Sequence, residues 1–142
     1  MRRGEYALWL AEQSAGGLLY ASPISVAIAL LIGLALWRVP GEYRCRLRNL
    51  FLICQALFLF PVASLAIGAA YRVPPERQPG VGVEAVAALQ SVQVISLLAS
   101  IALVVLAGKG LRARVVAFTL PANWYSFWAT FVAGMSVTGD WL

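Results

Sequence analysis

Four polar side chains recur at helical spacing inside a largely apolar stretch at residues 83–105. At about 100° per residue they fall within roughly 120° of one helix circumference; they are Gln90, Gln93, Ser96 and Ser100. Amides and hydroxyls both donate and accept hydrogen bonds. Such a stripe can therefore join neighbouring helices, or it can replace the hydration shell of a passing solute.

A second polar stripe follows heptad spacing within residues 115–137. Its members are Thr119, Asn123, Ser126 and Thr130. This spacing is typical of the seam of a left-handed helix pair. An unpaired amide in hydrocarbon is costly, so we expect Asn123 to bond a neighbouring helix or a backbone carbonyl freed by Pro121 or Pro61.

Three interpretations of the stripes stay open at this stage. Small membrane bundles generally carry polar seams that hold helices together, which favours packing. Two glutamines three residues apart, near an asparagine on another helix, also suit a water-accessible lining. The third possibility is a bound lipid or quinone headgroup.

Side chains for acid–base, nucleophilic or metal chemistry are scarce. The sequence has no histidine, and Cys45 and Cys54 lie nine residues apart without a CxxC motif. Glu84 and Asp140 lie only at the edges of apolar stretches, whereas ion-coupled carriers usually place ionisable groups inside the membrane. We therefore expect a protein that is not an enzyme and that uses no cofactor or metal.

The composition is that of an integral membrane protein. Of 142 residues, 61% are hydrophobic and 12% are charged, compared with about 25% charged residues in a soluble domain. The net charge of +5 is carried by short connections between apolar runs. This distribution indicates contacts with lipid headgroups and does not suggest nucleic-acid binding.

Four apolar segments are each close to the ~20 residues that a membrane-spanning helix needs. They cover residues 17–37, 49–70, 84–107 and 115–137. The sequence thus predicts an all-α, four-helix transmembrane bundle that forms one integral membrane domain over residues 1–142. Residues 1–16 are too short to span and suit an interfacial segment.

Basic residues concentrate in two connections, 38–48 and 108–114. These connections hold seven basic residues, against four in the N-terminus and the 71–83 loop together. The positive-inside tendency then places both connections in the cytoplasm and both termini outside. The expected lipid-headgroup contacts, or the rim of a pore mouth, are Arg44, Arg46, Arg48, Lys109, Arg112 and Arg114. Ten arginines against one lysine suggest a bacterial plasma (inner) membrane.

The sequence predicts a small multi-pass membrane protein that acts non-enzymatically within an assembly. It would be a homo-oligomer or an accessory subunit, because it carries more polar or small seams than one four-helix core needs. The alternative is a channel or uncoupled carrier for a small polar or anionic solute along a polar face of the third and fourth helices. The expected partners are membrane lipids and either further copies of the chain or other membrane subunits.

Overall fold

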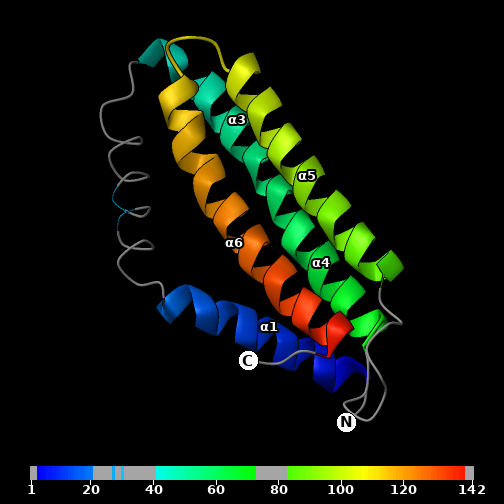
Figure 1. Cartoon of the computed structure of the whole chain (residues 1–142). Coiled ribbons are helices and arrows are strands. Elements are labelled where there is room, and N and C mark those ends of the chain that lie inside the picture. Colours follow the sequence, from blue (N-terminus) through cyan, green and yellow to red (C-terminus); the bar gives the residue numbers. More distant parts are fainter. Residues whose placement is uncertain (1–2, 21–26, 28–29, 31–40, 73–82, 140–142) are drawn as a thin grey trace.

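The described part of the chain is helical. The computed structural model describes residues 3–20, 27, 30, 41–72 and 83–139, and no strand occurs in these ranges. Its elements are α1 (Arg3–Tyr20), η1 (Gly41–Tyr43), α3 (Arg44–Gln55), η2 (Ala56–Phe58), α4 (Leu59–Ala70), α5 (Val83–Leu106) and α6 (Arg112–Thr138). Helices α3–α4, α5 and α6 lie side by side, and α1 crosses them obliquely near one end (Figure 1).

Helices α3 and α4 form one continuous rod through the 3₁₀ turn η2. Pro61 has no N–H to donate to the carbonyl of Leu57, so the backbone tightens in the turn before it. The rod Cys45–Ala70 and helix α5 are both long and apolar enough to cross a membrane. Only 28% and 17% of their most apolar stretches are buried, unlike the mostly buried core helix of a soluble protein.

Helix α6 is the central helix of the bundle. It contacts α1, α3, α4 and α5, and Pro121 lies within it without ending it. The helix stops at Gly139, whose φ of 77° lies in the left-handed region that favours glycine. The Gly139 N–H closes the last turn by bonding the Met135 carbonyl at 2.9 Å.

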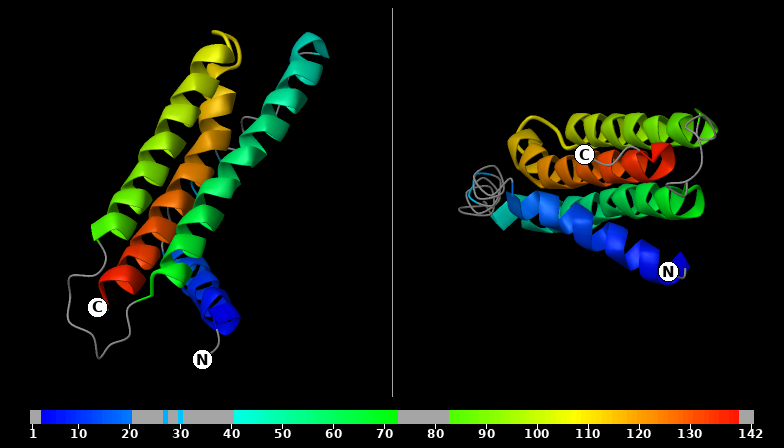
Figure 2. Two further views of the ribbon diagram at one scale, coloured as in Figure 1. Left: turned by 90° about the vertical axis from the view of Figure 1, so that its right-hand side faces the viewer. Right: turned by 60° about the horizontal axis from the view of Figure 1, so that its bottom comes forward.

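Helix α1 packs across the C-terminal half of α6 and the end of α4 (Figure 2). Tyr6 and Leu10 are buried with Val132 of α6. The guanidinium of Arg72, just beyond α4, lies 4.1 Å from the centre of the Tyr6 ring, a cation–π contact. These contacts fix the N-terminal helix at the end of the bundle where α4 and α6 finish.

The helix bounds differ from those expected mainly at the N-terminal side. The segments expected at 84–107 and 115–137 are helical and correspond to α5 and α6, and of these two α5 has the length and apolarity of a membrane span. The segment expected at 49–70 begins instead at Arg44, because arginine is a good helix former and Leu47 extends the buried face. The segment expected at 17–37 falls largely outside the described residues. Helix α1 continues past residue 17, so no helix boundary lies there.

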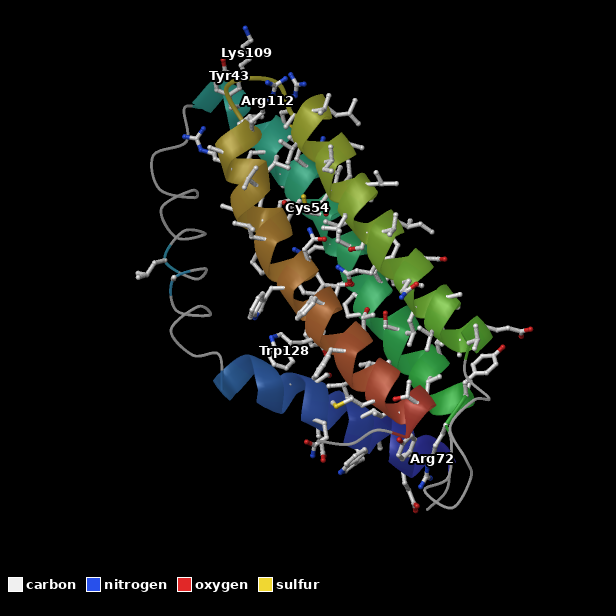
Figure 3. All side chains as sticks on the ribbon, in the orientation of Figure 1. Tyr43, Cys54, Arg72, Lys109, Arg112 and Trp128 are labelled. Atoms are coloured by element: carbon white, nitrogen blue, oxygen red, sulfur yellow. The ribbon has the colours of Figure 1, made fainter. Side chains whose placement is uncertain are left out.

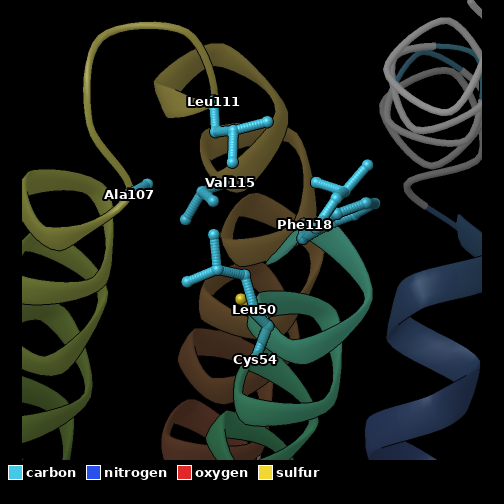
Figure 4. Close-up of a cluster of buried hydrophobic side chains, with 7 residues drawn as sticks. Leu50, Cys54, Ala107, Leu111, Val115 and Phe118 are labelled. Carbon is cyan, nitrogen blue, oxygen red and sulfur yellow. The ribbon is translucent and has the colours of Figure 1, made fainter. Parts of the chain in front are cut away.

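Within the described ranges, three apolar clusters form the core. The first (Figure 4) joins α3 to the α5–α6 turn, the second joins α5 to α6, and the third joins α1 to α6. Their buried members are, in that order, Leu47, Leu50, Cys54, Ala107, Leu111, Val115 and Phe118; Ala85, Leu89, Ala133 and Val137; and Tyr6, Leu10 and Val132. Along α5 and α6, the first and second clusters are separated by the residues of both predicted polar stripes.

Helices α4 and α6 pack closely together at Gly68. A Cβ atom placed on Gly68 would lie 2.8 Å from both the Cα and the Cβ of Ala133. The Ser136 hydroxyl donates to the Gly68 carbonyl at 2.9 Å, which such a close approach permits. A residue larger than glycine does not fit here without moving one of the two helices.

Replacing Gly68 with alanine should therefore separate α4 from α6. We expect Gly68→Ala to lower the free energy of unfolding in detergent micelles by roughly 1–3 kcal/mol, the usual cost of overpacking. Gly134→Ala is the matched control, because a Cβ atom at Gly134 would meet nothing within 4 Å. Equal stability of the two variants would contradict this account of the crossing.

Candidate functional site

The two predicted stripes meet between α5 and α6. We define the polar seam by its eight side chains from three helices: Ser64 of α4; Gln93, Ser96 and Ser100 of α5; and Thr119, Asn123, Ser126 and Thr130 of α6. Ser64, which was outside both stripes, enters the seam because α4 packs against the same face of α6.

Asn123 is the hub of the upper half of the seam. Its Nδ2 donates to the Ser100 hydroxyl at 2.6 Å and to the Thr119 carbonyl at 2.9 Å. Its Oδ1 accepts from the Ser96 hydroxyl at 3.3 Å. Both amide protons and the amide oxygen are thus engaged, two of the bonds reaching α5. The carbonyl it bonds is not the one that Pro121 deprives of its helical donor, which belongs to Ala117.

Gln93 organises the lower half. Its Oε1 accepts from the Ser126 hydroxyl at 3.2 Å and from the Thr130 hydroxyl at 3.4 Å. The Thr130 hydroxyl donates its only proton to Gln93. The Ser64 hydroxyl must therefore be the donor in its 3.0 Å contact with Thr130. This chain of bonds joins α4, α5 and α6 at one level of the bundle.

Every hydroxyl proton of the seam has an acceptor within the chain. Ser64, Ser96 and Ser126 are fully buried, and Ser100 and Thr119 are nearly so. The latter two turn their hydroxyl protons back onto their own helices, to the carbonyls of Ser96 and Val116. Such an arrangement holds helices together, since every hydroxyl proton already has an acceptor.

Gln90 does not join the seam. It is exposed, one turn before the half-buried Gln93 on α5. The stripe predicted from spacing therefore includes one residue, Gln90, that does not face α6. Spacing alone placed both glutamines within the same 120° arc, and only the position of α6 separates them.

The predicted basic rim gathers at one end of the bundle. Helix α3 begins there with Arg44, and the turn between α5 and α6 lies beside it; Figure 3 labels Lys109 and Arg112 there. The Arg46 Nη2 donates to the Leu106 carbonyl at 3.3 Å. The Arg114 Nη1 donates to the Gly110 carbonyl at 3.3 Å. Arg48 is exposed at the same end.

A buried polar pair at the opposite end was missed by sequence reasoning. The Ser136 hydroxyl gives its proton to the Gly68 carbonyl, so the Tyr6 hydroxyl donates to Ser136 in their 2.7 Å contact. The sequence did hold one sign of this pair: Tyr6, Leu10 and Ser14 are spaced four residues apart, which places them on one face of α1. Ser14 in turn contacts the Tyr125 hydroxyl at 3.4 Å.

The aromatic side of α6 lies away from the seam. Trp124, Phe127, Trp128 and Phe131 form a run of ring contacts with centroids about 6 Å apart. The indole N–H groups of Trp124 and Trp128 are buried and have no hydrogen-bond partner in the described ranges. The two phenylalanines are exposed.

Metal ligands do not cluster in the part of the chain that the structure describes, where no three His, Cys, Asp or Glu side chains come together. Comparison with protein-family models, with curated proteins and with solved structures finds no match to this chain. The arguments about function therefore rest on the seam, on the exposed surface and on the charge distribution.

Loss of the Asn123 amide should weaken the fold of the single chain, because all its partners lie within that chain. Asn123→Leu leaves Ser96 without an acceptor and should lower the free energy of unfolding in micelles by about 1–3 kcal/mol. Ser91→Ala is the control, since it removes an exposed α5 hydroxyl that bonds only the Ala87 carbonyl of its own helix and should change stability by less than ~0.5 kcal/mol. Equal losses in both variants would contradict the assignment of the seam.

Proposed function

We propose that this chain is a small multi-pass membrane protein that acts non-enzymatically within a membrane assembly, as a homo-oligomer or as an accessory subunit. The observation that carries the proposal is a pair of exposed glutamines, Gln55 and Gln90, one on each membrane-length helix. Neither makes a hydrogen bond to any described residue. In a bilayer, such amides need partners from outside the chain.

Both amides lie within the hydrocarbon core if the helices span a membrane. At 1.5 Å per residue, Gln55 lies about 10 Å beyond Arg48 along the rod, and Gln90 about 10 Å inside the start of α5. Most of their exposed neighbours are apolar, among them Leu52 and Leu59 on the rod and Val94 on α5. The exposed hydroxyl of Ser91, beside Gln90, bonds a carbonyl of its own helix. Lipid chains satisfy the apolar neighbours but offer no hydrogen bond to an amide.

The channel or carrier alternative has less support. A solute path along α5 and α6 needs amides and hydroxyls that face an open space. In the seam, the Asn123 amide and the Gln93 carbonyl are already bonded to protein groups. Opening a path there would require the breaking of bonds that hold three helices together.

The charge distribution supports an orientation. The basic rim lies at one end, and α1 with the C-terminal end of α6 lies at the other (Figure 3). By the positive-inside tendency we place the rim in the cytoplasm and both termini outside, in a bacterial plasma membrane as the excess of arginine suggests. Lipid phosphates are then the natural partners of the exposed Arg48, Lys109 and Arg112.

The assembly itself is tested by crosslinking in native membranes followed by sizing. We expect the full chain to migrate in species larger than one copy across a range of protein-to-lipid ratios. Empty-membrane samples and a denatured sample set the background. A chain that runs only as a free monomer at every ratio would overturn the proposal.

Cys45 offers a test of orientation. It is exposed beside the basic rim, whereas Cys54 is buried. A membrane-impermeant maleimide should label the chain in inside-out vesicles and leave it unlabelled in intact cells, and Cys45→Ser should abolish the labelling. Labelling in intact cells would reverse the orientation.

A further inference from the structure

Six residues of α5 form a heptad seam on its exposed side. Steps of four, three, four, three and four residues connect them, and every member is exposed. We call this set the outer seam: Val83, Ala87, Gln90, Val94, Leu97 and Ile101. Helix α5 lies at an edge of the bundle (Figure 2), so this face has room for another helix.

The outer seam has the composition of a helix-pairing surface. Ala87, Val94 and Ile101 fall at one heptad position, and Val83, Gln90 and Leu97 fall at the other. A seam of small and branched apolar residues can pack closely against the same seam of a second helix. Ala87, beside Gln90, leaves space for close approach of a second backbone. A polar side chain in such a seam hydrogen-bonds across paired membrane helices.

We propose that a second copy of this chain docks along the outer seam, with Gln90 of each copy bonded to Gln90 of the partner subunit. The inference rests on the proposed function and names the partner. Copies inserted in the same orientation meet around a two-fold axis along the membrane normal, which places identical residues opposite each other. A carboxamide is its own complement, because it carries two donors and an acceptor.

Gln55 does not provide an equivalent surface. The 3₁₀ turn η2 begins at the next residue, and its tighter winding breaks the heptad. Gln55 cannot pair with Gln90 of another copy either. Thr130 bonds both Ser64 of α4 and Gln93 of α5, so these two residues lie at the same depth. Gln55 comes nine residues before Ser64, and Gln90 comes three residues before Gln93. Because the two helices are antiparallel, these offsets add to a difference in depth of about 18 Å at 1.5 Å per residue.

Disulfide crosslinking locates the interface on α5. Val94 and Ile95 are adjacent, and each is 54% exposed, but they point about 100° apart and only Val94 belongs to the outer seam. In a Cys45→Ser, Cys54→Ala background in phosphatidylcholine liposomes, we expect Val94→Cys to form disulfide-linked dimers and Ile95→Cys to form several-fold fewer. Equal or reversed yields would overturn the proposed seam.

Energy transfer between chains labelled at Cys45 measures the pairing itself. Gln90→Leu should weaken association roughly sevenfold, the loss of two average membrane hydrogen bonds. Ser91→Ala is the matched control, because it removes an exposed α5 hydroxyl that already bonds the Ala87 carbonyl of its own helix, and it should associate like the unmodified chain. If Gln55→Leu weakens association and Gln90→Leu does not, the α5 interface is wrong while the assembly stands. If the unmodified chain shows no transfer at any protein-to-lipid ratio, self-assembly itself is wrong.

Discussion

The need to pair polar side chains in an apolar setting governs this structure. Helix α6 carries an asparagine and several hydroxyls along one face, and each must find a partner where water is excluded. Asn123 and Gln93 meet this requirement by collecting hydroxyls from facing helices. Once these bonds are made, the rotation of α5 and α6 about their own axes is fixed.

Other features of the bundle follow from the central position of α6. Helix α4 approaches it closely at Gly68, which lets Ser64 reach Thr130 and lets Ser136 reach a backbone carbonyl. Helix α1 then closes the same end through the Tyr6 hydroxyl. Apolar clusters lie on both sides of the seam along α5 and α6, so the polar contacts occupy the middle and specify which helix faces meet.

The same requirement separates internal surfaces from external ones. Amides that α6 can reach are bonded within the chain, whereas Gln55 and Gln90 face outward among apolar neighbours. Under the proposed function, these two amides bond partners outside the chain, because an amide in hydrocarbon needs a hydrogen-bond partner. The polar seam therefore supports a structural role, and the outward amides support a role in assembly.

The sequence by itself determined the helical class, the membrane-like composition and the approximate length of α5 and α6, because apolar run length and residue spacing act locally. Spacing also brought most seam residues onto common helix faces. Only the tertiary structure decided that Gln93 pairs with α6 while its neighbour on the stripe, Gln90, does not. It also added Ser64, Tyr6 and Ser136. Periodicity tells which residues share a face, but the close packing of helices distant in sequence decides what that face meets.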